Sequence, residues 1–167
     1  MHHLRALTSY QKTFILFILS SIAALGIAFF CQYVLHMEPC ELCLWERRPW
    51  WILLITGTIG LTTPQRYAKW IIYTGILCLL SSVILAIIHS GVEHKWWKSP
   101  SAACNTHNLA TSLSLEPVKS CDTPTYLFGL PLSMTEQGGI YALMMFIITL
   151  PLSRPSHKHI TPPPQTK

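Results

Sequence analysis

The chain has 167 residues, half of them apolar and only 11% charged, far below the roughly 25% of charged residues found in soluble domains. This composition indicates a membrane protein of a single domain. The formal charge of +5 comes from basic residues scattered between long uncharged stretches, so they form no basic face, and a nucleic-acid partner is excluded.

The first expected element is a membrane-spanning helix over residues 13–35. The run from Thr13 to Leu35 carries no formal charge, and its length is close to the ~20 residues that cross a bilayer. It is too long for the apolar part of a signal peptide and lacks a small-residue cleavage site, so we expect it to remain in the membrane. Residues 1–12 form the expected cytoplasmic N-terminus.

The second expected span covers residues 44–62. Its apolar part, Pro49 to Leu61, reaches bilayer length only if the helix begins near Leu44 and includes the segment Trp45-Glu46-Arg47-Arg48. Charges in the first turns of a membrane helix are costly, so they lie at the interface or face the bundle interior, and they often mark function. Pro49 lacks a backbone donor, which predicts a kink or a later helix start.

The third and fourth expected spans cover residues 70–89 and 137–152, both uncharged over most of their length. The fourth is the shorter helix, because Gly138, Gly139 and Pro151 trim its regular core. The following residues, 153–167, are rich in proline and are expected to form a disordered cytoplasmic tail.

The charged residues divide between the two sides of these spans. Basic residues in short loops mark the cytoplasmic side. Seven basic residues lie before the first span, between the second and third spans, or after the fourth: Arg5, Lys12, Arg66, Lys69, Arg154, Lys158 and Lys167. All seven acidic residues fall on the other side. We therefore expect cytoplasmic termini and outward-facing loops at 36–43 and 90–136. The predicted fold is an all-α, polytopic, four-helix transmembrane bundle.

The expected topology also divides the six cysteines. Cys40 and Cys43 lie in the first outer loop, and Cys104 and Cys121 lie in the second, so all four face a compartment where disulfides persist. The other two fall within spans and are expected to be buried packing residues, Cys31 and Cys78.

The C-x-x-C motif formed by Cys40 and Cys43 stands just before the second span. A sulfur at a helix N-terminus lies beside unpaired backbone N–H groups, which favours the thiolate form. We expect Cys43 to be the better placed of the two, with Arg47 adding a positive charge from the same helical face. The spacing also occurs in zinc sites, so the motif alone does not establish redox chemistry.

Cys104 and Cys121 would close a loop of about eighteen residues, worth on the order of 3 kcal/mol if the bridge were only structural. Two alternatives to a redox protein therefore stay open: a membrane assembly factor with structural cysteines, and a metal-binding module that adds His89, His94 or His107. A C-x-x-C bridge closes almost no chain, which counts against the structural alternative. Taken alone, His89 is most simply an interfacial polar residue.

Three segments of the chain match motifs of one family. They are the nonapeptide from Pro39 to Arg47, the run Gly91-Val92-Glu93 followed by Trp96-Trp97 and Pro100, and Phe128-Gly129-Leu130-Pro131. Together with the two later cysteines, the nonapeptide resembles the DsbB family, whose members reoxidise the periplasmic dithiol oxidase DsbA and pass the electrons to quinone. The resemblance extends from about Tyr10 to Leu152.

The resemblance implies a thiol-disulfide:quinone oxidoreductase in the bacterial inner membrane, with ubiquinone or menaquinone as cofactor, a DsbA-like partner and no metal. It implies that Cys40 and Cys43 are the quinone-coupled pair and that Cys104 and Cys121 are the partner-facing pair. It also implies that Arg47 is the quinone-site arginine and that His89 is the histidine near the quinone, with His94 as the alternative. A paralogue dedicated to one partner is an alternative within this class, because the loop between Cys104 and Cys121 is short.

Overall fold

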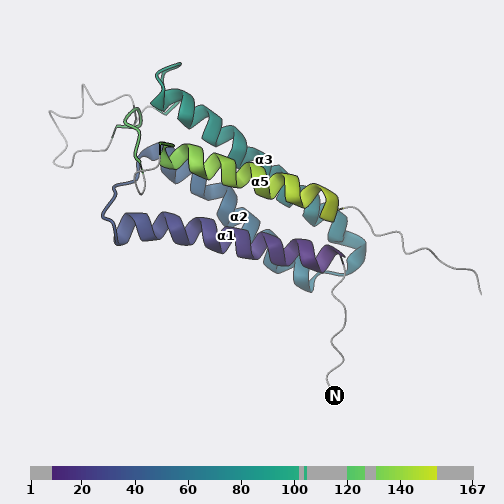
Figure 1. Cartoon of the computed structure of the whole chain (residues 1–167). Helices are drawn as coiled ribbons and strands as arrows, with labels where there is room; N and C mark the ends of the chain where they lie inside the picture. The colour runs from purple at the N-terminus through teal and green to yellow at the C-terminus, as the bar shows by residue number, and fades with distance from the viewer. Residues whose placement is uncertain (1–8, 102–103, 105–119, 127–130, 154–167) are drawn as a thin grey trace, which may run out of the picture.

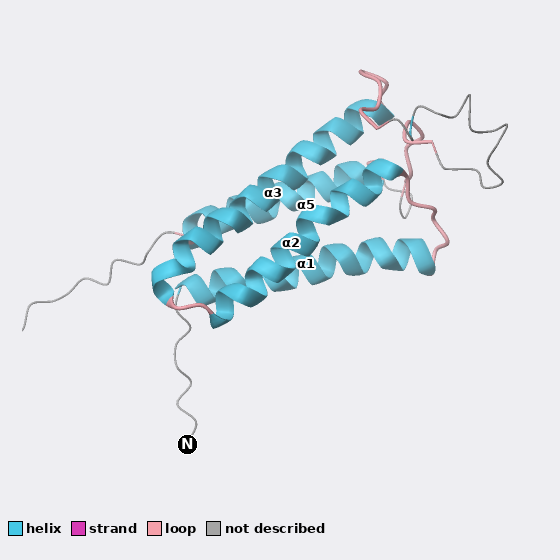
Figure 2. Cartoon of the chain, turned by 180° about the vertical axis from the view of Figure 1, so that it is seen from behind, coloured by secondary structure: helices cyan, strands magenta, loops and turns pink. Residues whose placement is uncertain are grey.

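The computed structural model describes residues 9–101, 104, 120–126 and 131–153 (Figure 1). Four helices follow one another in this part of the chain: α1 (Ser9–Tyr33), α2 (Glu41–Thr62), α3 (Gln65–Glu93) and α5 (Met134–Leu152). The described residues contain a single isolated β-bridge, between Tyr126 and Ser133, and otherwise helices and loops (Figure 2). The prediction of an all-α bundle is confirmed, whereas the predicted disordered tail lies almost wholly outside the described residues.

The helices run alternately up and down, and each packs against its neighbour in the chain (Figure 1). α5 closes the bundle against α1, where the hydroxyl of Thr13 donates to the carbonyl of Leu152 over 3.3 Å. The beginning of α1, the end of α5 and the turn between α2 and α3 therefore lie at one end of the bundle. The connections that carry the four loop cysteines lie at the other end.

The surface of the bundle is that of a membrane protein. Among the described residues, two helices are long and apolar enough to cross a membrane, Tyr10–Tyr33 and Gln65–Glu93. Large apolar side chains point outward along the helices, including Leu19 at 61% exposure and Leu77 at 62%. A soluble monomer rarely exposes apolar surface of this extent, because water would drive it to aggregate.

The core of the bundle lies where α1 packs closely against its neighbours. Phe14 and Phe17 of α1 are fully buried, and each faces a glycine on another helix. A β-carbon at Gly60 of α2 would overlap the ring of Phe14, and one at Gly75 of α3 would overlap the ring of Phe17. Small residues let membrane helices approach closely, so dispersion contacts can hold them together.

Local capping fixes where α2 begins. Cys40 occupies the N-cap, and its sulfur accepts the backbone N–H of Cys43 over 3.3 Å. The helix continues through Pro49, which is buried within it, up to Thr62. A later start at Pro49 is therefore wrong, and the charged segment before the proline belongs to the helix.

The ends of α3 and α5 that flank the long loop are also capped. After α3, Lys95 adopts a left-handed conformation with φ of 59°. The N–H groups of Lys95 and Trp96 donate to the carbonyls of Val92 and Gly91, which is the pattern of a Schellman motif. α5 begins with a capping box between Ser133 and Glu136.

Candidate redox site

The two cysteine pairs meet at the loop end of the bundle. Cys104 and Cys121 form a disulfide with their Cα atoms 5.3 Å apart. Both are buried in one apolar cluster with Cys40, and the partly buried Cys43 packs against it. The structure thus brings together the four cysteines that the sequence predicts in the two outer loops.

The sulfurs of Cys40 and Cys43 lie 2.8 Å apart, longer than a disulfide bond of ~2.05 Å, so this pair is present as two thiols. The backbone N–H at the helix start points to the sulfur of Cys40, because the N-cap residue accepts from the third residue of the helix. The prediction that Cys43 is better placed is therefore wrong. The hydrogen bond with Cys40, together with burial, raises the pKa of Cys43.

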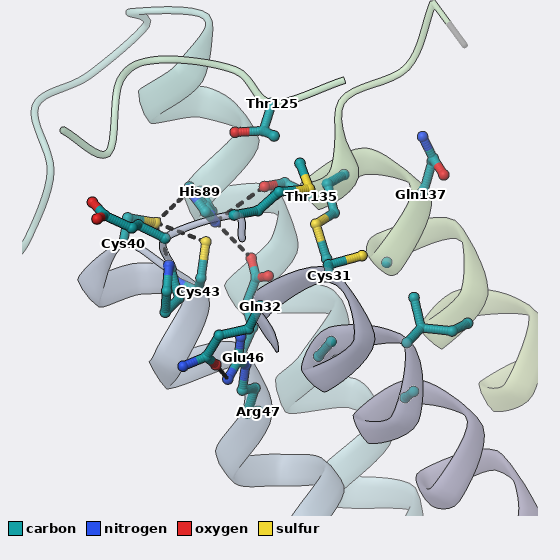
Figure 3. Close-up of a pocket in the computed structure, with 18 of the residues that line it drawn as sticks. Cys31, Gln32, Cys40, Cys43, Glu46, Arg47, His89, Thr125, Thr135 and Gln137 are labelled. Atoms are coloured by element: carbon teal, nitrogen blue, oxygen red, sulfur yellow. Dashed lines mark hydrogen bonds and ion pairs between the residues drawn. The ribbon is translucent and has the colours of Figure 1, made fainter. Parts of the chain in front are cut away.

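His89 connects the thiol pair to a buried polar network (Figure 3). The side chain is 2% exposed, and its Nε2 lies 3.5 Å from the sulfur of Cys40. Its Nδ1 lies 2.9 Å from Glu46 Oε1 and 3.2 Å from Thr135 Oγ1. A carboxylate can only accept, so we assign the proton to Nδ1, which leaves the lone pair of Nε2 directed at Cys40.

Glu93 extends this network to the start of α5. Thr135 donates to Glu93 Oε1 over 3.0 Å, and Ser133 donates to Glu93 Oε2 over 2.6 Å. Glu93 Oε1 also lies 3.9 Å from Nε2 of His89. Each polar group of this network therefore has a partner, and the contacts join α2, α3 and α5 at the site.

Sequence reasoning missed Glu46, Glu93 and Thr135. Glu46 follows Cys43 by three residues and Glu93 follows His89 by four, so helical spacing alone places each on the face of a predicted site residue. That signal could have found the two carboxylates. Thr135 precedes the predicted fourth span and carries no such signal.

The two neighbouring arginines have different surroundings. Arg47 Nη1 donates to Gln32 Oε1 over 2.6 Å, and its guanidinium lies 5.3 Å from the ring centroid of Phe29. Arg48 is exposed and lies over the ring of Trp45, 5.8 Å from its centroid. Arg47 therefore faces α1 and the bundle interior, whereas Arg48 faces outward.

A pocket of about 310 Å³ opens beside the thiols. Cys40, Cys43, Arg47 and His89 form part of its wall. Most of the remaining wall is apolar and comes from α1, α2 and α5: Ala24, Leu25, Ile27, Ala28, Trp50, Met134 and Tyr141. The site therefore combines a dithiol, a guanidinium and an imidazole with an apolar cavity.

The other candidate residues lie away from this arrangement, with one exception. His94 pairs with Glu136 over 2.9 Å and does not join the thiols. Cys78 packs in the apolar core, as predicted, while Cys31 is buried but also lines the pocket. His107 lies outside the described residues.

Comparisons with known proteins agree with this chemistry. A sequence model of the family "Disulfide bond formation protein DsbB" matches residues 10–152. An uncharacterised protein of Rickettsia prowazekii is 32% identical over 84% of each chain. The protein-disulfide oxidoreductase DsbI of Salmonella typhimurium is 30% identical over 76% of this chain and 55% of its own length.

The disulfide bond formation protein B of a Shewanella strain is 25% identical over 78% of this chain and 83% of its own length. No solved structure matches the chain. The family match spans the helices, both cysteine pairs and the pocket. The chain is therefore a helical membrane protein that belongs to the DsbB family of disulfide bond formation proteins.

Proposed function

We propose that the chain reoxidises a periplasmic DsbA-like dithiol oxidase and passes the electrons through its two cysteine pairs to a membrane quinone. The observation that carries this proposal is the gathering of four cysteines in one buried cluster beside an apolar pocket. The family match supports a role in disulfide bond formation, and the pocket supplies a place for a lipid-soluble electron acceptor.

The proposed orientation puts the cysteine end outside the inner membrane and both termini in the cytoplasm. Arg66 and Lys69 lie in the first turns of α3, at the opposite end of the bundle from the cysteines. Glu46, Glu93 and Glu136 lie at the cysteine end. Because basic residues in short loops favour the cytoplasmic side of the membrane, the end with Arg66 and Lys69 is assigned to the cytoplasm. In this arrangement residues 13–35, 44–62, 70–89 and 137–152 span the bilayer.

Thiol-disulfide exchange starts at the pair that closes the long loop. A thiolate of the reduced partner attacks Cys104, which forms a mixed disulfide and releases Cys121 as a thiolate. The partner's second thiolate then attacks the mixed disulfide, so the partner leaves oxidised and this pair is left reduced. Cys121 next attacks Cys40 of an oxidised Cys40–Cys43 pair, and the electron pair leaves on the sulfur of Cys43. The thiolate of Cys104 then attacks Cys121 in this mixed disulfide, so the Cys104–Cys121 disulfide forms again and Cys40 and Cys43 are left reduced.

The residues of the pocket fit a quinone headgroup. The volume of about 310 Å³ is at the lower end of the ~300–1,000 Å³ of small-molecule sites, and the apolar wall suits an isoprenoid-bearing ring. Arg47 would hold one of its oxygens through the guanidinium on a largely apolar wall. His89 would offer a second donor once its Nε2 has taken a proton. When bound, a quinone supplies an acceptor for two electrons and two protons.

His89 provides the route by which thiol protons leave the pair. Cys43 lies within hydrogen-bond distance of Cys40, and Cys40 of Nε2 of His89. As the two sulfurs bond to each other, Nε2 takes the proton of Cys40, Cys43 reacts as the thiolate that the exchange released, and the two electrons pass to the acceptor in the pocket. Glu46 at Nδ1 stabilises the imidazolium that results. Thr135, whose hydroxyl also contacts Nδ1, helps to keep the ring oriented.

The proposal is tested by anaerobic mixing of the purified protein with a reduced DsbA-like partner and a soluble quinone, with quinone absorbance followed over time. Wild type should consume one quinone per partner oxidised, and Cys43→Ser should stop quinone reduction. Cys78→Ser is the matched control, because this cysteine is buried in the core away from the site. Quinone reduction that survives in Cys43→Ser would refute the proposed electron route.

A further inference from the structure

Three metal-ligand atoms converge beside the pocket. The sulfurs of Cys40 and Cys43 and the imidazole of His89 all lie within 4.8 Å of one another. Two of the separations are 2.8 Å between the sulfurs and 3.5 Å from Cys40 to Nε2 of His89. Tetrahedral zinc, with bonds of ~2.3 Å to sulfur and ~2.0 Å to nitrogen, needs roughly 3.8 Å between sulfurs and 3.5 Å from sulfur to nitrogen. The distance from Cys40 to His89 already fits, and the sulfur of the half-buried Cys43 would have to move away from that of Cys40 by about 1 Å.

The surroundings of His89 also suit a metal ligand. Its Nδ1 contacts Glu46 at 2.9 Å and Thr135 at 3.2 Å, so Nε2 directs its lone pair toward the sulfurs. A carboxylate that holds the far nitrogen of a ligand histidine is a regular outer contact of zinc sites, because it fixes the tautomer and the ring orientation. This contact is independent of the C-x-x-C spacing, which alone would be a weak indication.

From this geometry we propose that the reduced protein binds one Zn²⁺ through Cys40, Cys43 and His89. Binding converts both thiols to thiolates and releases two protons to solvent, with no change of oxidation state. All three ligands line the pocket, so a water molecule there could complete the zinc coordination, and Glu93, with Oε1 3.9 Å from Nε2, is an alternative fourth ligand. Oxidation of the pair to a disulfide removes two of the three ligands, so only the reduced form binds zinc.

Zinc at this position would act as a redox-gated inhibitor. A thiolate whose lone pair is shared with Zn²⁺ is a poorer nucleophile and electron donor, and the metal would stand at the wall of the pocket. The inhibitory consequence rests on the proposed function, whereas zinc binding itself does not. Zinc binding and the proposed function can therefore be refuted separately.

Binding is measured by titration of Zn²⁺ against a chromophoric chelator, with the full chain in detergent. A Cys104→Ser/Cys121→Ser background is first reduced with a phosphine reductant, which is then removed under anaerobic conditions, so that the Cys40–Cys43 pair is present as two thiols. One Zn²⁺ per chain is expected. Adding Cys43→Ser should weaken binding by roughly 100-fold or more. Adding Glu46→Gln should weaken it by about 10–100-fold, because the histidine ligand loses its orienting carboxylate.

Two controls separate the site from other thiols and from misfolding. Cys31 lines the same pocket but is not in the ligand cluster, so Cys31→Ser should leave the affinity within about twofold. Bound zinc should protect Cys40 and Cys43, and not Cys31, from alkylation mapped by mass spectrometry. Helical circular dichroism of each variant should match that of the background protein.

The proposal is overturned if the reduced background protein binds no zinc, or if Cys43→Ser binds it as tightly. Equal binding by the protein with an oxidised Cys40–Cys43 pair would overturn it as well. If zinc binds as expected while no quinone is reduced without zinc, the zinc site stands and the proposed electron route fails. If quinone reduction is normal and zinc does not bind, the proposed electron route stands and the zinc site fails.

Discussion

Replacing Arg47 by glutamine removes a guanidinium from the pocket wall while leaving the thiols in place. Arg47 donates to Gln32 at 2.6 Å and packs over Phe29, and neither contact involves a cysteine. A neutral amide at this position keeps a hydrogen-bond donor but loses the charge. We therefore expect a defect confined to the step in which electrons leave the thiol pair.

The size of the defect follows from the position of the charge in an apolar wall. Complete removal of a donor that stabilises developing negative charge in such a site costs about 10²–10³ in rate, or ~2.7–4 kcal/mol, which sets the upper range for the loss of charge in Arg47→Gln. Arg47→Lys keeps the charge but loses the planar fork, so a smaller loss is expected. The matched control is Arg48→Gln, because Arg48 is exposed over Trp45 and is not part of the pocket wall. Its rate should stay within about threefold of wild type.

The assay measures two rates on each variant under anaerobic conditions: quinone reduction by absorbance, and exchange with the reduced partner by trapping mixed disulfides on gels. Arg47→Gln should slow the first and leave the second unchanged. Equal loss of both rates would refute the assignment of Arg47 to the acceptor side. A defect in Arg48→Gln as large as that in Arg47→Gln would refute the separation of the two arginines.

Three substitutions and one control test the fold by thermal unfolding in detergent. Gly75→Val should destabilise the bundle by about 1–3 kcal/mol, because its side chain would overlap a buried ring of α1, while Gly26→Ala, with open space around it, should not lower stability. Lys95→Gly should stabilise the end of α3 by about 1 kcal/mol, because glycine adopts the left-handed conformation without strain. Ser133→Ala should cost about 1–2 kcal/mol, because it removes the cap of α5 and a hydrogen bond to Glu93. No change in either Gly75→Val or Ser133→Ala would contradict the packing or the cap described.

Hydropathy and charge were sufficient to predict a helical membrane bundle, because a long apolar segment in lipid must satisfy its backbone within itself. Helix starts were harder to place. α2 begins at Glu41, before the expected Leu44, because the sulfur of Cys40 serves as the cap. α5 begins at Met134 because Ser133 and Glu136 form a capping box, and the pattern Ser-x-x-Glu was readable in the sequence.

The candidate site was only partly predictable for a different reason. Residue type and spacing identify Cys40, Cys43 and Arg47 within one segment, since local sequence sets their relative positions. The contact of His89 with Cys40 depends on how α2 and α3 are rotated about their axes. The contact of His89 with Thr135 depends on where α5 begins beside α3. Sequence patterns within one helix do not determine those rotations.

The same contacts that orient His89 also hold the helices together. Glu46 from α2, His89 and Glu93 from α3, and Thr135 from α5 satisfy one another at the end of the bundle. Polar contacts between helices in an apolar environment favour association, because each group would otherwise be unpaired in lipid. Oxidation of the thiol pair directly changes the hydrogen bond between Cys40 and His89, which links the pair to this network. The frame can therefore stay fixed while the sulfurs change state, which the proposed electron route requires if the membrane helices are not to repack in each cycle.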